Sequence, residues 1–306
     1  MSGRGRPVTL VGGYLGAGKT TLVNHLLRHA DGRRLAVLVN EFGDLPIDGD
    51  LIEARDDNLI NIAGGCICCS FGSDLVAALL ALKDRADIDQ IVIETSGVAL
   101  PGSVVQALRL LPGLDLDGVI VVVDAETIEE RSHDRYMSDT VLRQLTDADL
   151  VLLNKIDLVT AEKAKQVASW LATQAPRARM VLAHNARIPV EVALGLRTDR
   201  RGARGSAMPH HTSQYESFSI EQESNTDVPK LVETLSDPRL GILRAKGFVR
   251  DGLGQLLALQ VVGCRVDVSP APPGQDGLAK LVFIGLSGQL DHRLIFAGLA
   301  AAASSR

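Results

Sequence analysis

The chain has 306 residues, enough for one large domain and a smaller one, and its 46% hydrophobic and 23% charged residues fit a globular protein with a sizeable core. Lysine and arginine number 32 against 37 aspartates and glutamates, and this acidic balance argues against a nucleic-acid-binding protein. No apolar run reaches the ~18 residues that span a membrane, and the N-terminus does not resemble a signal peptide. We therefore expect a cytoplasmic protein.

The first part of the chain alternates short apolar runs with helical patterns. Strands are predicted at residues 9–11, 35–39, 58–62, 90–94, 118–124, 149–154 and 179–183, and helices at residues 19–29, 74–83 and 161–173. The run at residues 119–123 is apolar throughout, as is typical of strands that are buried on both faces. The alternation therefore predicts an α/β domain over residues 1–197, with a mainly parallel, doubly wound sheet.

The first motif is GYLGAGKT at residues 13–20, which matches G-x-x-x-x-G-K-[ST] between a predicted strand and a predicted helix. Glycines let backbone N–H groups approach phosphate oxygens, and the helix N-terminus adds partial positive charge. Lys19 is expected to reach the β- and γ-phosphates and Thr20 to bind Mg²⁺, both in catalytic roles. The nucleotide-binding residues predicted here are Gly13, Gly16, Ala17, Gly18, Lys19, Thr20 and Thr21. The alternative, a tight turn without a ligand, would leave a buried lysine without a partner.

The second motif, NEFGD at residues 40–44, ends the second predicted strand. Its position suits a switch segment that senses the γ-phosphate, and the alternative for its acidic residues is a solvated loop. Further on, ETSG at residues 94–97 ends the apolar strand at residues 91–93. Glu94 is expected to act in catalysis by organising Mg²⁺ through water, and the amide of Gly97 is expected to face the γ-phosphate.

Three of the four cysteines, Cys66, Cys68 and Cys69, form a C-x-C-C motif between these two segments. In a reducing compartment, clustered thiolates favour Zn²⁺ or Cu(I), and three of them leave one coordination position open. Asp44 is a candidate fourth ligand, although the close spacing can also limit the working sulfurs to two. The alternatives are cysteines buried as small hydrophobic side chains, a redox switch, or a structural metal site that a ligand from elsewhere in the chain closes.

The motif NKID at residues 154–157 follows a late predicted strand and is expected to bind guanine through Asn154, Lys155 and Asp157. The Asp157 carboxylate can accept hydrogen bonds from N1–H and from the exocyclic amine of guanine. Adenine offers no such pair of donors, so the site would select GTP over ATP. The alternative is a surface loop made of ordinary turn residues.

The character of the chain changes near Thr198. Residues 198–212 are rich in Arg, Gly, Ser and Pro and are predicted to be a linker. Beyond the linker, strands are predicted at residues 214–220, 247–250, 255–262 and 280–284, and helices at residues 228–235 and 291–302. These elements predict a small α+β domain over residues 213–306.

Together these motifs resemble the CobW-like family of P-loop GTPases, relatives of the nickel accessory GTPases for urease and hydrogenase. The resemblance rests on residues 13–27, 40–44, 64–70, 94–97 and 154–157, and it continues at LRAKGF (243–248) and LVFIG (281–285). It implies a metal chaperone or insertase for zinc or cobalt, in which the clustered cysteines are the metal motif and Asp44 lies near it. The chain departs from the family pattern at Leu100, where relatives commonly carry an acid before proline.

The sequence therefore predicts a metallochaperone that binds and hydrolyses GTP with Mg²⁺, and that binds zinc, with cobalt as the alternative, at the cysteine motif. It would pass the metal to a client metalloprotein, which contacts the C-terminal domain. Neither nucleic acid nor membrane is an expected partner, and the oligomeric state stays open. Two alternatives remain: a regulatory GTPase switch with a structural zinc site, and a maturation factor that delivers cobalt to one enzyme.

Overall fold

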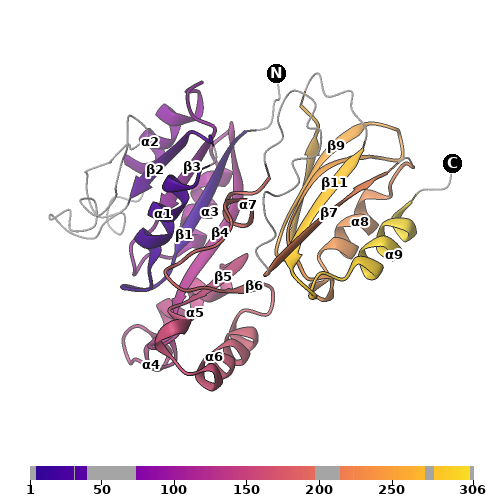
Figure 1. The fold of residues 1–306 in the computed structure, drawn as a ribbon. Helices are drawn as coiled ribbons and strands as arrows, with labels where there is room; N and C mark the ends of the chain where they lie inside the picture. The colour runs from indigo at the N-terminus through magenta and orange to yellow at the C-terminus, as the bar shows by residue number, and fades with distance from the viewer. Residues whose placement is uncertain are drawn as a thin grey trace. The chain divides into compact units, whose positions relative to one another are not determined.

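The computed structural model describes residues 5–30, 32–39, 74–196, 214–222, 224–272 and 279–303. It divides into two compact units, Gly5–Ala193 and a second unit that begins at Leu194 (Figure 1). Residues 40–73, which include the cysteine motif, and residues 197–213, which include the predicted linker, lie outside the described part of the chain. Each unit is built around a sheet of its own.

The first unit contains a six-stranded sheet in the order β2-β3-β1-β4-β5-β6, and every neighbouring pair is parallel. The strands are β1 (Arg6–Gly12), β2 (Leu35–Val39), β3 (Gln90–Glu94), β4 (Leu114–Asp124), β5 (Leu150–Asn154) and β6 (Arg179–Leu182). The chain places β2 and β3 on one side of β1 and then crosses to β4, so the order reverses beside β1. In sheets of this kind, ligands bind at the carboxyl ends of the strands near such a reversal.

Helices cover both faces of this sheet, which confirms the predicted doubly wound α/β fold. The helices are α1 (Lys19–Arg28), α2 (Asp74–Lys83), α3 (Pro101–Arg109), α4 (Ile128–Ser132), α5 (Ser138–Thr146), α6 (Ala161–Gln174) and α7 (Val190–Leu194). One core joins apolar residues of α2, α3, α5 and α6 to one face of the strands, for example Leu79, Leu145 and Leu171. Helix α1 contacts β1 and β3 and buries Leu22 and Leu26. Because β2, β3 and β5 are buried at every residue, apolar side chains are needed on both of their faces.

Several elements of the first unit were not predicted from the sequence. Strand β4 begins at Leu114 rather than at residue 118, and it carries the acidic Asp117 into the sheet, where Thr9 donates a hydrogen bond to it at 3.1 Å. Helix α3 begins with Pro101, which suits a first helical turn because proline has no N–H to leave unpaired there. Helices α4 and α7 have only five residues each, too few for a helical period to be visible in the sequence.

The second unit is a five-stranded antiparallel sheet in the order β10-β9-β8-β11-β7, with helices α8 and α9 packed against one face. Its elements are β7 (Tyr215–Glu221), α8 (Val228–Leu235), β8 (Ile242–Arg250), β9 (Leu256–Val262), β10 (Arg265–Pro270), β11 (Lys280–Leu286) and α9 (His292–Ala302). Leu231 and Leu299 of the helices pack on Leu259 and Phe283 of the sheet. The predicted α+β character is confirmed, although β10 was not predicted and β8 begins five residues earlier than expected.

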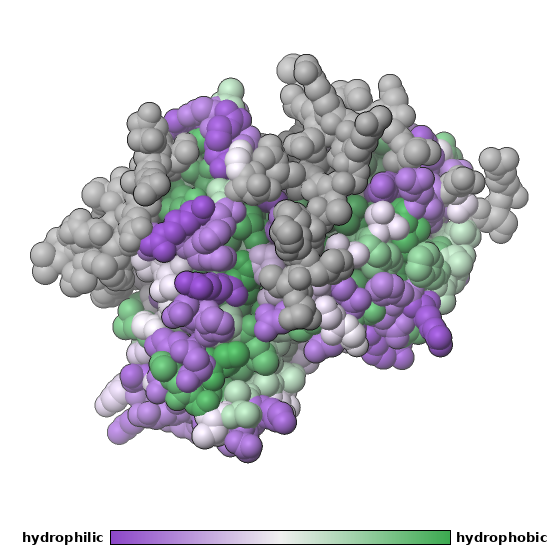
Figure 2. All heavy atoms as spheres, in the orientation of Figure 1, coloured by the Kyte–Doolittle hydropathy of each residue, from purple (hydrophilic) through white to green (hydrophobic). Residues whose placement is uncertain are grey.

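Within the described residues, the structure contains no helix that is long and apolar enough to cross a membrane. The described surface in Figure 2 mixes hydrophilic and hydrophobic areas, with a paler green area over α9. There Leu294 and Phe296 are 42% and 51% exposed, while Ile295 and Leu299 of the same helix are buried. Helix α9 therefore carries apolar residues on its exposed side as well as on its buried side.

Candidate nucleotide site

The turn between β1 and α1 has a backbone that only glycine accommodates well. Gly13, Gly16 and Gly18 have φ values of +132°, +75° and +107°, which lie in the region that other residues avoid. A Cβ at Gly13 would lie 2.1 Å from the carbonyl oxygen of Val122, and one at Gly18 would lie 2.5 Å from Nδ2 of Asn154. The turn closes with a hydrogen bond from the amide of Ala17 to the carbonyl of Tyr14 at 3.2 Å. This cradle fits the phosphate-binding loop that the sequence predicts.

Lys19 and Thr20 begin α1 at the carboxyl edge of the sheet. Lys19 is only 8% exposed, and its Nζ donates to the carbonyl of Tyr14 at 3.3 Å, so its charge is held over the turn. Thr20 Oγ1 donates to Oε1 of Glu94 at 2.7 Å, and Glu94 is 3% exposed at the end of β3. The structure thus brings together Thr20 and Glu94, two predicted residues that lie 74 positions apart in the sequence. Thr21, in the same turn of the helix, is exposed.

Asn154 ties the phosphate side of the site to the predicted base side. At the end of β5, its Nδ2 donates to the carbonyl of Ala17 at 2.9 Å and its Oδ1 accepts from the amide of Ala186 at 2.8 Å. Asn154 is 2% exposed, and a buried amide without these partners would be costly. Asp157, three residues further on, lies exposed in a 3₁₀ turn (Ile156–Leu158). The structure therefore links Asn154 to the loop, and leaves the Asp157 carboxylate on the surface.

The loop that follows β6 belongs to the same edge and was missed in the sequence. Asn185 and Ala186 both have a φ of +51°, an unusual backbone for residues other than glycine. Besides Asn154, the ring of His25 holds this loop, since its Nε2 lies 2.8 Å from the carbonyl of Ile188 and must donate to it. Burial lowers the pKa of His25, which favours the neutral ring. Strained backbone that is held from two sides is typical of functional loops.

Asp124 is a second residue that the sequence analysis did not assign to the site. It ends β4 just as Glu94 ends β3, and its Oδ2 accepts from Nζ of Lys155 at 2.6 Å. Its Oδ1 accepts from the amide of Glu126 at 2.9 Å. The side chains of Asp124 and Lys155 are 10% and 30% exposed, and Lys155 has a φ of +60°. The ion pair therefore fixes a lysine of the NKID motif whose backbone is already unusual.

We expect Asp124→Asn to weaken the binding of GDP and of a non-hydrolysable GTP analogue equally, each by about tenfold, because a charge-assisted hydrogen bond to Lys155 is lost. Both nucleotides share the base, so the two affinities should fall together when measured by displacement of a fluorescent nucleotide. Asp139→Asn is the matched control, since Asp139 forms an exposed pair with Arg143 on α5. Unchanged affinities in Asp124→Asn would show that the pair does not support the site.

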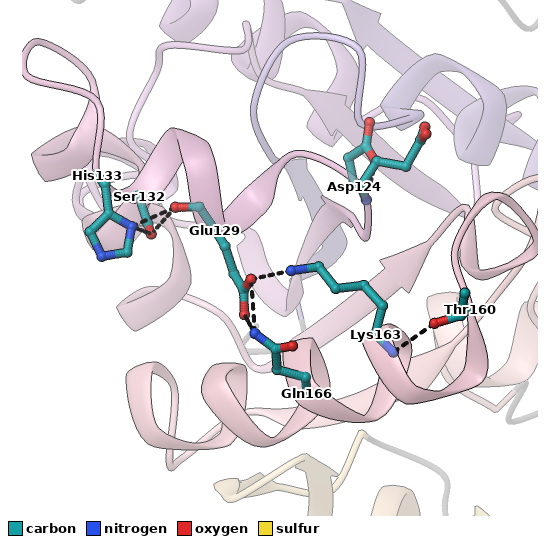
Figure 3. Close-up of polar contacts among 8 residues, drawn as sticks. Asp124, Glu129, Ser132, His133, Thr160, Lys163 and Gln166 are labelled. Carbon is teal, nitrogen blue, oxygen red and sulfur yellow. Dashed lines mark hydrogen bonds and ion pairs between the residues drawn. The ribbon is translucent and has the colours of Figure 1, made fainter.

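Helix α4 connects the phosphate-binding turn with the helix that follows the NKID motif. The guanidinium of Arg131 lies 5.4 Å from the ring centroid of Tyr14, within cation–π range. Figure 3 shows Glu129 of the same helix in contact with Lys163 and Gln166 of α6. The turn and α6 are therefore joined through α4.

The predicted transition-metal ligands Asp44, Cys66, Cys68 and Cys69 all lie outside the described residues. Within the part of the chain that the structure describes, no group of three or more His, Cys, Asp or Glu side chains is arranged to hold a metal ion. Cys264, the fourth cysteine, is buried at the turn between β9 and β10.

These features define a P-loop nucleotide-binding protein: the sheet is parallel, and a glycine-lined turn precedes α1. A lysine lies over that turn, and a threonine and an acid lie beside it. The chain belongs to the CobW/HypB/UreG family of P-loop GTPases, because the family model for the CobW/HypB/UreG nucleotide-binding domain matches residues 7–182. The cobalamin synthesis protein cobW C-terminal domain matches residues 215–303. The resemblance found in the sequence is therefore confirmed in both units.

Curated relatives match most of the chain. It is 30% identical to zinc chaperone CobW from Sinorhizobium sp, over 96% of each chain. It is 34% identical to zinc chaperone CobW from Pseudomonas aeruginosa, over 85% of this chain and 81% of that protein. Zinc-regulated GTPase metalloprotein activator 1 from Schizosaccharomyces pombe is 36% identical, over 51% of this chain and 40% of that protein.

Proposed function

We propose that the protein is a GTP-hydrolysing metallochaperone that binds zinc at Cys66, Cys68 and Cys69 and passes it to a client metalloprotein in a nucleotide-dependent way. The proposal rests on the point at which the segment with the cysteine motif joins the nucleotide site. Strand β2 ends at Val39, whose register partner on β3 is Glu94. The segment that contains the cysteine motif therefore starts beside the acid that hydrogen-bonds Thr20.

The residues at the start of α1 and the end of β3 fit Mg²⁺, which prefers hydroxyl and carboxylate oxygens. Thr20 would bind the ion directly and Glu94 would hold it through water. When bound, Mg²⁺ neutralises charge on the β- and γ-phosphates. Lys19 adds a second positive charge at the same end of the loop, and the amide of Gly97 would face the γ-phosphate.

Base selection would come from Asp157 together with the loop after β6. The exposed carboxylate can accept from both guanine donors, while Asn154 and Lys155 keep the surrounding backbone in place. Because hydrolysis in this class depends on positioning and charge, we expect slow turnover that a partner or the metal accelerates.

The nucleotide site and the cysteine motif would be coupled through the end of β2, where the segment with the motif begins. If the γ-phosphate orders the NEFGD segment, the change reaches the cysteine motif within the same stretch between β2 and α2. Thiolates suit zinc, and three of them leave a position for a client ligand. The zinc-related names of the relatives support zinc over cobalt as the cargo.

The client would contact the C-terminal unit. Its helix α9 leaves the apolar side chains of Leu294 and Phe296 partly exposed, and these side chains would contribute to the surface that the client binds. The C-terminal unit would then hold the client while the first unit binds nucleotide.

The experiment that tests the proposal is a zinc titration against a competing chromophoric chelator, on protein loaded with GDP or with a non-hydrolysable GTP analogue. A structural zinc site would resist the chelator in both states, and its removal would unfold the protein. A cobalt carrier would show itself by metal preference under competition, after allowance for the Irving–Williams order.

A further inference from the structure

Side chains of α5 and of its C-terminal cap residue hydrogen-bond the segment that leads from β3 to α3 at two points. The side chain of Gln144 donates from Nε2 to the carbonyl of Gly97 at 3.1 Å and to the carbonyl of Ala99 at 2.8 Å. One turn later, Oδ2 of Asp147 accepts from the amide of Gly102 at 2.8 Å, where α3 begins. The two side chains therefore fix both ends of residues 97–102.

The contact by Gln144 is strong because the amide is buried. Gln144 is 2% exposed, so its two N–H groups have no access to water if the segment moves away from α5. An unpaired buried donor costs more than an ordinary hydrogen bond contributes. Asp147 is half-buried, and desolvation raises the pKa of its carboxyl, although the hydrogen bond from the amide of Gly102 acts in the opposite direction. The segment is consequently held where α5 places it.

The opposite side of this segment faces the phosphate-binding turn. A Cβ at Gly97 would lie 2.6 Å from Cγ of Leu15 and 2.7 Å from the backbone nitrogen of Leu15. Gly97 therefore fits between the turn on one side and the amide of Gln144 on the other. A glycine is needed at this point because a side chain would collide with backbone as well as with Leu15.

We infer that Gln144 is a positioning residue for the γ-phosphate. From α5, its side chain fixes the carbonyls of Gly97 and Ala99, on either side of Val98. The amide of Gly97 is thereby held in place to face the third phosphate. The inference rests on the proposed GTP site, and it assigns a role to a residue outside every motif in the sequence. GDP lacks the third phosphate, so its binding does not depend on this arrangement. A residue that only stabilised the fold would affect both nucleotides alike.

The test is Gln144→Leu, which keeps the size of the side chain and removes its donors. We expect its affinity for a non-hydrolysable GTP analogue with Mg²⁺ to fall about tenfold, with a similar loss in kcat for GTP, because two hydrogen bonds to the segment are lost. Its affinity for GDP should stay within about twofold of the wild type, which also reports that the variant is folded. Gln166→Leu is the control, since Gln166 also donates to two oxygens, those of Glu129, but on the surface.

A second pair of variants covers the case in which Gln144→Leu does not fold. Asp147→Ala removes the acceptor for Gly102 and should show the same selective loss, while Asp147→Asn keeps an acceptor oxygen and should behave as the wild type. Equal losses for GDP and the GTP analogue, or no loss for either, would overturn the inference. A wild-type protein that binds neither nucleotide would instead refute the proposed function, so the two failures can be told apart.

Discussion

Lys19→Ala should lower kcat for GTP hydrolysis by about a thousandfold, the upper range for loss of one preorganised charge in an active site. The lysine is 8% exposed and held over the phosphate-binding turn by the carbonyl of Tyr14, so its charge is already in place before phosphate enters. Phosphoryl transfer depends mainly on such fixed charges, because the protein supplies little covalent chemistry. Phosphate release under single-turnover conditions measures the effect.

Lys165→Ala is the control for this experiment, because Lys165 lies exposed on α6, a helix that carries none of the predicted nucleotide-binding residues. Thermal unfolding of both variants would separate loss of activity from loss of fold. A Lys19→Ala protein that hydrolyses GTP at the wild-type rate would contradict the role assigned to the P-loop.

Asp157→Asn should change the base that the protein selects. The carboxylate accepts from N1–H and the amine of guanine, whereas an asparagine offers a donor that suits the C2 carbonyl of xanthine. We expect the ratio of GDP affinity to XDP affinity to fall by about a thousandfold, since a mismatch leaves polar groups unpaired on both the protein and the base. Displacement of a fluorescent nucleotide by GDP, XDP and ADP gives the three affinities.

The exposed neighbour Glu162→Gln on α6 removes a charge close by in sequence and should leave base preference unchanged. If Asp157→Asn retained the guanine preference of the wild type, the NKID motif would not read the base.

Much of the nucleotide site could be predicted because its signals are local. The glycines, Lys19 and Thr20 lie within eight consecutive residues, and Glu94 directly ends an apolar strand. Asp124 ends β4 in the same way, but no recognisable motif follows it in the sequence. The position of each of these residues at the edge of the sheet is set by the strand or turn that carries it, and can be predicted without knowing its distant partners.

The contacts between segments could not be predicted in this way. Whether Asn154 reaches Ala186, or Gln144 reaches Gly97, depends on strand order and helix packing, which a single sequence does not fix. Gln144 lies among ordinary helical residues, and nothing in its surroundings distinguishes it from Gln166. Asp44 and the cysteines stay predictions, because they lie outside the described residues.

The central claim is that the nucleotide state changes the affinity for zinc. The most direct measurement is the zinc titration with a competing chelator, on GDP-loaded protein and on protein with a non-hydrolysable GTP analogue, with Cys66→Ala as the control. We predict that the two zinc affinities differ on the order of tenfold, a typical allosteric coupling, and that the difference disappears in Cys66→Ala. Equal affinities in the two states, or zinc that the chelator cannot remove from either, would contradict the account and favour a GTPase switch with a structural zinc site.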